Sequence, residues 1–95
     1  MEKWTQSEAI AFECAREVIT HLRAILTGQI AEEASKACPD AERLAALHAE
    51  RSRLFRERTG LRVKDQATVA RVRAEYGARV RSLRSERSER HAVAE

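Results

Sequence analysis

The sequence has little of what loops, phosphate sites and membrane spans require. It contains one proline and three glycines, and the glycines stand alone at positions 28, 60 and 77. They cannot form the glycine-rich loop that cradles phosphate groups. Charged residues interrupt the apolar ones every few positions, so no stretch approaches the ~20 residues of a membrane-spanning helix. We therefore expect long helices joined by short loops, and no association with a membrane.

Cysteine and histidine are equally sparse, with two cysteines and three histidines. Cys14 and His21 share a helical face, but seven residues separate them, about 10 Å along a helix axis. Zinc ligands lie about 2.0–2.3 Å from the metal, and the chain has no CxxC or HxxxH pair, so adding Cys38 and His48 does not help. The same separation keeps Cys14 from being activated by His21 as a nucleophile. We expect free thiols, no metal, no cofactor, no small-molecule substrate and no enzymatic activity.

Length and composition favour a small intracellular domain. With 95 residues, 43% of them hydrophobic and 35% charged, the chain has room for one domain that buries roughly 60–65% of its unfolded surface. The first four residues include an acidic side chain and no apolar core, unlike a secretory signal. We expect a cytoplasmic protein.

The first helix is predicted to begin near Thr5, because Thr5 and Glu8 have the spacing of a capping box. Apolar residues then recur at steps of three and four: Phe12, Ala15, Ile19, Leu22, Leu26 and Ile30. Four more, Ala11, Cys14, Val18 and Ile25, widen this stripe well past 100°. A helix this apolar must be covered by more than one neighbour, so it is expected at the centre of the fold.

Three further signals divide the rest of the chain. Pro39 ends the first helix, although a break at Gly28 is left open, and Asp40 begins the second. Gly60 is expected to end the second helix in a left-handed conformation. Asp65 is expected to cap the third helix, whose apolar stripe ends at Leu83.

These signals together predict an all-α fold. We expect a small three-helix, mostly antiparallel bundle or helical hairpin that forms a homodimer. The single domain covers residues 1–84, with helices at about 5–36, 40–59 and 65–84. Residues 85–95 are expected to form a basic helical extension or a frayed tail.

Charge is divided unevenly along the chain. Residues 1–45 carry five basic and eight acidic side chains, whereas residues 46–95 carry thirteen basic and seven acidic ones. Nearly all of the basic residues in the second half are arginines. A polyanion or an acidic protein surface is therefore a plausible partner.

The second helix carries the first candidate site. Arg51 falls within the face made by its leucines and Phe55, and Arg58 follows one heptad later. Either the arginine stem packs while its guanidinium reaches solvent, or this face binds a partner through bidentate arginine contacts. We take Arg51, Phe55 and Arg58 as the candidate protein interface.

The third helix carries the alternative site. Its candidate contacts to nucleic acid or to an acidic partner are Arg73, Arg81, Arg84, Arg87 and Arg90. The turn at Gly60 between two helices also has the general form of a helix-turn-helix. Against that motif, the helix before the turn is long, and Arg56 stands where a small packing residue is expected.

The third helix also has a face of small residues. Ala70, Ala74 and Gly77 cluster there, and a glycine within a helix costs about 1 kcal/mol relative to alanine. Close approach of another helix would explain Gly77, and we take these residues as a candidate surface for self-association. The sequence as a whole predicts a small regulatory or adaptor protein that binds a protein partner. The alternative is a nucleic-acid-binding regulator that uses the third helix.

Overall fold

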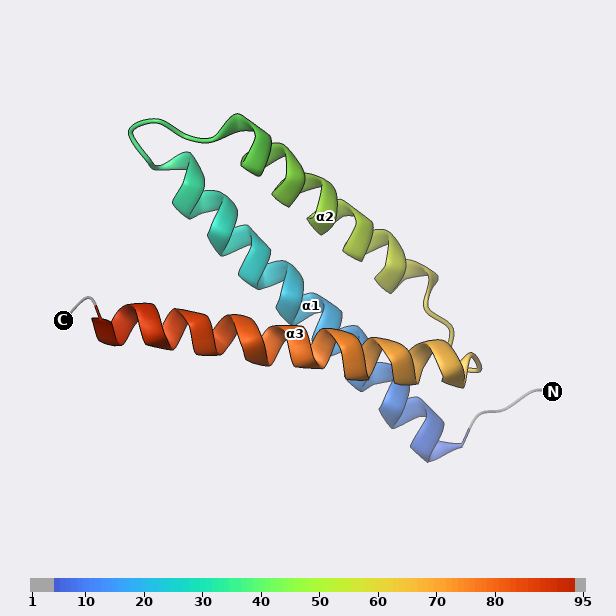
Figure 1. Cartoon of the computed structure of the whole chain (residues 1–95). Helices are drawn as coiled ribbons and strands as arrows, with labels where there is room; N and C mark the ends of the chain where they lie inside the picture. The colour runs from blue at the N-terminus through green and yellow to red at the C-terminus, as the bar shows by residue number, and fades with distance from the viewer. Residues whose placement is uncertain (1–4, 94–95) are drawn as a thin grey trace.

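The computed structural model describes the backbone of residues 5–93 and the side chains of residues 5–88. It contains three helices, α1 (Gln6–Ala34), α2 (Ala41–Gly60) and α3 (Gln66–Val93), as Figure 1 shows. No strand occurs within the described residues. The predicted all-α class with three helices is confirmed.

Polar side chains begin each helix where the sequence predicts it. Thr5 and Glu8 form the expected capping box, with the Thr5 hydroxyl accepting from the Glu8 amide at 3.0 Å and the Glu8 carboxylate accepting from the Thr5 amide at 2.8 Å. Asp40 accepts from two backbone amides at the start of α2. Asp65 accepts from the Thr68 amide at the start of α3. These contacts satisfy amides that have no partner inside the helix.

Helix α1 runs unbroken through Gly28 and ends at Ala34, before Pro39. The Glu33 side chain closes the turn that follows, because its carboxylate accepts from the Asp40 amide at 2.9 Å and from Lys36 at 2.9 Å. Glu33 is only 3% exposed. One carboxylate thus joins the end of α1 to the beginning of α2.

The predicted conformation of Gly60 is wrong. No described residue has a positive φ, and Gly60 is the last helical residue of α2. Leu61 instead turns the chain in an extended conformation, with φ −67° and ψ 138°. Its side chain is buried in the core, which holds the α2–α3 connection in place without a left-handed cap.

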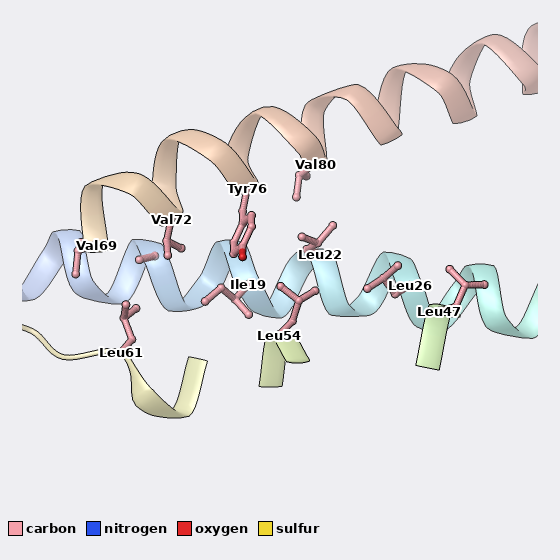
Figure 2. Packing of buried hydrophobic residues seen from close by; sticks show 11 residues of the cluster. Ile19, Leu22, Leu26, Leu47, Leu54, Leu61, Val69, Val72, Tyr76 and Val80 are labelled. Carbon is pink, nitrogen blue, oxygen red and sulfur yellow. The ribbon is translucent and has the colours of Figure 1, made fainter. Parts of the chain in front are cut away.

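Helix α1 lies at the centre, as its wide apolar stripe predicts. Both α2 and α3 pack on it, whereas the backbones of α2 and α3 do not approach each other within the described residues. Figure 2 shows Val72, Tyr76 and Val80 of α3 pointing toward α1 from one side, with Leu54 of α2 on the other. The complete core is Ala15, Ile19, Leu22, Leu26, Leu47, Leu54, Leu61, Val69, Val72, Tyr76 and Val80.

Helix α3 departs from a regular antiparallel bundle. Figure 1 shows α1 and α2 side by side as an antiparallel pair, while α3 crosses α1 and its second half diverges from it. Among the side chains that the structure describes, Val80 is the last buried residue of α3 and Leu83 is partly buried. Arg87 takes the position where the stripe would continue and is exposed. Residues 85–88 carry no apolar side chain, and the helix continues beyond them to Val93.

No helix within the described residues is long and apolar enough to cross a lipid bilayer.

Candidate functional site: an arginine and phenylalanine seam between α1 and α2

Helix α2 sorts its charges onto two sides. Its two central carboxylates, Glu50 and Glu57, both point to the side of α3, where they meet arginines. Arg51 and Arg58 lie on the other side and reach across to α1. These two carboxylates therefore neutralise Arg71 and Arg79 of α3. The side of α2 that faces α1 is left with an excess of positive charge.

A polar network joins α2 to α3 where their backbones do not touch. It consists of Glu50, Arg53 and Glu57 from α2 and Arg71, Tyr76 and Arg79 from α3. Arg79 binds Glu50 through both of its terminal nitrogens, one of them at 2.8 Å. The hydrogen bond from Arg79 holds the pKa of Glu50 below its ordinary value, although partial burial opposes the shift. The network is structural, because its charges are satisfied within the chain.

Tyr76 connects this network to the core. Its ring is buried, with 8% of the residue exposed, as its place in the apolar stripe predicts. Its hydroxyl donates to Glu57 at 2.7 Å and accepts from Arg53 at 3.3 Å. With its hydroxyl committed and its ring covered, Tyr76 offers no face on which a nucleic-acid base could stack.

The opposite side of α2 forms a surface that we call the seam. It consists of Thr20, Arg23 and Thr27 from α1 and Arg51, Phe55 and Arg58 from α2. Arg51 donates to the Thr27 hydroxyl at 3.1 Å, and Arg58 donates to the Thr20 hydroxyl at 2.9 Å. The two arginines are seven residues apart, and so are the two threonines. The later arginine pairs with the earlier threonine, as the antiparallel arrangement of α1 and α2 requires.

Arg23 and Phe55 form the middle of the seam. The guanidinium of Arg23 lies over the Phe55 ring, 5.1 Å from its centroid. Its Nε donates to the Arg51 carbonyl at 3.2 Å. Phe55 is nevertheless 51% exposed. An aromatic ring held by a stacked cation, yet half open to solvent, is a rigid apolar contact point.

The seam arginines have no anionic partner among the side chains that the structure describes. Among the described residues, no carboxylate forms an ion pair with Arg23, Arg51 or Arg58. Arg51 has one further contact, to the His48 ring at 3.4 Å. The threonines bind one nitrogen of Arg51 and one of Arg58. A guanidinium has five N–H donors, so each of these arginines has further donors for an anion. The structure thus brings together the three predicted interface residues, Arg51, Phe55 and Arg58, in one surface.

Sequence reasoning missed the contribution of α1 to the seam. Thr20, Arg23 and Thr27 are polar residues outside the apolar stripe of α1, and nothing in the sequence pattern indicates which helix they face. The repeated seven-residue spacing of the two threonines and of the two arginines is the signal that could have paired them.

The predicted arginines of α3 form a separate edge. Arg73, Arg81 and Arg87 are exposed and have no carboxylate partner within the described side chains, and Arg84 contacts the His21 ring at 2.9 Å. Arg90 lies among residues 89–95, whose side chains the structure does not describe. These arginines take no part in the α2–α3 network, so the described part of α3 also presents arginines without a carboxylate partner.

The small-residue face of α3 is open. Ala70 and Ala74 are exposed. At Gly77 an added Cβ would meet only the Arg81 guanidinium, at 3.5 Å. Within one chain, no helix approaches Gly77 as the glycine was expected to require.

Cys14 and Cys38 are free and exposed. Within the described residues, no group of three histidine, cysteine or acidic side chains could hold a metal ion. No protein-family model matches the sequence, and comparison with curated proteins and with solved structures finds no similar chain.

Proposed function

We propose that this protein is a small, non-enzymatic regulatory or adaptor protein that binds an acidic protein partner through the seam. The proposal rests on the position of Phe55, which is half exposed among three arginines that no described carboxylate pairs with. Arginine and aromatic side chains are enriched among the residues that dominate binding energy at protein interfaces. Arg51 and Arg58 would bind carboxylates of the partner, and Phe55 would bury apolar surface between them.

The seam is suited to binding because it is ordered before a partner arrives. The threonine hydroxyls hold Arg51 and Arg58, and Arg23 holds Phe55. Side chains that are already restrained lose less conformational entropy on binding. A surface arginine without such restraints would contribute less to affinity.

Capture of partners from the native host tests this proposal. Extract with and without nuclease is passed over the immobilised wild-type protein and over two variants. The seam variant carries Arg51→Glu and Phe55→Ala, and the control variant carries Arg73→Ala and Arg81→Ala on α3. We expect a partner that survives nuclease, binds wild type and the control variant, and is lost with the seam variant. Retention of that partner by a folded seam variant would contradict the proposal.

A nucleic-acid-binding regulator is the alternative, and one observation favours it. Arg71 and Arg79 are neutralised by carboxylates, whereas Arg73, Arg81 and Arg87 form no ion pair with any side chain from residues 5–88. If these arginines contact phosphates, duplex DNA binds at low salt and log affinity falls with log salt by about 0.9 per contact. Replacing three of them by alanine then flattens that slope by about three contacts, while the seam variant leaves it unchanged.

The homodimer and the cytoplasmic location belong to this proposal as well. The breadth of apolar surface on α1 supports self-association, since Ile10 and Cys14 remain exposed after α2 and α3 have packed. Sedimentation at micromolar concentration tests the dimer against a monomer of 10.8 kDa.

A further inference from the structure

The described part of the chain leaves two large hydrophobic residues exposed, Ile10 and Phe55. Ile10 lies on the first turns of α1 and is 56% exposed, slightly more than Phe55. Single apolar residues at a surface are common. These two differ from that ordinary case because the charged side chains around them are of opposite sign.

Ile10 lines a shallow, open hollow, and the Phe55 ring stands half exposed between the seam arginines. The hollow has a volume of about 350 Å³ and is lined by residues of α1 alone. Its lining is almost wholly apolar where it is exposed, although two carboxylates stand at its border. We call it the Ile10 hollow, and its lining residues are Gln6, Ala9, Ile10, Glu13, Cys14 and Glu17.

The charges around the two surfaces are opposite. Glu13 and Glu17 border the Ile10 hollow, and within the described residues Glu17 forms no ion pair while Glu13 pairs only with the neighbouring Arg16. Arg51 and Arg58 flank Phe55 without a carboxylate partner. An aromatic side chain with cations beside it therefore fits an apolar hollow with carboxylates beside it.

The two surfaces also share a border. A second, polar hollow of about 530 Å³ lies between them, lined by Glu17 of the first surface and by Thr20 and Arg58 of the seam. Two adjacent, complementary surfaces on one molecule can contact each other twice in a two-fold pair, because each copy supplies both halves. The shared border would then lie at the two-fold axis.

We propose that a second copy of this chain occupies the Ile10 hollow, with Phe55 of each copy inserted into the hollow of the other and Arg58 facing Glu17 across the contact. This assigns self-association to α1 and the seam, and not to Ala70, Ala74 and Gly77. The contact specifies the homodimer proposed above and does not depend on the acidic protein partner. One consequence does rest on it: because the dimer covers Phe55, self-association and binding of the acidic partner exclude each other.

A charge exchange between two variants tests the contact. Glu17→Arg places cations at both surfaces of one protein, and Arg58→Glu places anions at both surfaces of the other. Wild type is expected to form a dimer at roughly 100 µM, as small interfaces bind weakly, and each variant alone is expected to remain a monomer. The equimolar mixture is expected to form a heterodimer, because both contacts are then complementary. Glu42→Arg and Arg73→Glu, which alter exposed charges elsewhere, are the matched controls and should sediment like wild type.

Cys14 provides an independent measurement, since it lines the Ile10 hollow and Cys38 does not. In the Cys38→Ser protein, the rate at which a thiol reagent modifies Cys14 should fall at least fivefold between dilute and concentrated protein. In the Cys14→Ser protein, the rate for Cys38 should not change. Phe55→Ala in the Cys38→Ser background should keep Cys14 fast at both concentrations.

The proposal is overturned if wild type sediments as a monomer throughout, or if the mixture of folded variants fails to associate. A dimer unaffected by Glu17→Arg and Arg58→Glu would place the contact on another face and would also overturn it. Partner capture separates this result from the proposed function. If wild type is monomeric but the seam variant still loses the partner, only the dimer is wrong.

Discussion

The central position of α1 predicts an unusually large penalty for Leu22→Ala. The Leu22 side chain is completely buried, and Figure 2 shows it between Leu54 of α2 and Val80 of α3. Truncation of a buried leucine costs about 2–5 kcal/mol, and the cost is larger where the surroundings cannot collapse into the space. Two helices held apart by α1 cannot both move inward, so we expect about 3–4 kcal/mol.

That loss is a large part of the free energy of unfolding. A chain of this length is stable by roughly 5–14 kcal/mol. Each 1 kcal/mol lowers the melting temperature of such a domain by about 4–8 °C, so Leu22→Ala should lower it by about 12–30 °C. Leu44→Ala is the matched control, because the same truncation at a half-buried position of α2 removes fewer contacts, and Ser85→Ala beyond the core should change little.

Urea unfolding followed by circular dichroism at 222 nm measures all three variants. We expect Leu22→Ala to lower the midpoint strongly at an unchanged slope, Leu44→Ala to lower it by less than half as much, and Ser85→Ala to stay within about 0.5 kcal/mol of wild type. A loss below about 1 kcal/mol for Leu22→Ala, or an equal loss for the two leucines, would refute the assignment of α1 to the centre of the core.

Two further predictions concern the α2–α3 network. Tyr76→Phe removes a hydroxyl that donates to Glu57 and accepts from Arg53. The free energy of unfolding measured in urea should fall by about 1–2 kcal/mol. In a double-mutant cycle with Glu57→Gln the two losses should not add, and additive losses would mean that the contact does not contribute to stability. Because the pKa of Glu50 lies below the ordinary 4.5, its contribution to the free energy of unfolding is present above pH 4.5 and is lost as the pH falls through the lowered pKa. Glu50→Gln should therefore flatten the decline of the urea midpoint below pH 4.5, and an unchanged decline would show that Arg79 does not stabilise the carboxylate.

Local sequence signals correctly predicted where the helices begin. The Thr5–Glu8 box and the caps at Asp40 and Asp65 form as predicted, because each uses only residues within three positions of one another. The ends were less predictable. α1 ends at Ala34, where Glu33 reaches the Asp40 amide across the turn, and Gly60 stays helical because burial of Leu61 holds the turn.

The candidate site was also predictable from the sequence only in part. Periodicity placed Arg51, Phe55 and Arg58 on one face of α2, and it placed Arg73, Arg81 and Arg84 together on α3. It did not show that Thr20, Arg23 and Thr27 would complete the seam, since the register of two helices depends on side chains of both. The Ile10 hollow could not be foreseen either, because Ile10 lies outside the apolar stripe of α1 and only Cys14 of the lining belongs to it.

The sequence alone determined where each helix begins and which of its faces is apolar, because capping and periodicity act within a few turns of one chain segment. Only the tertiary structure decided which arginines pair with which carboxylates. Glu50 and Glu57 are used by Arg79 and Arg71 of α3, and so cannot neutralise Arg51 and Arg58 on the opposite side of the same helix. The arginines that remain uncompensated depend on which helix each carboxylate faces, and helix packing sets that arrangement over distances that no local pattern encodes.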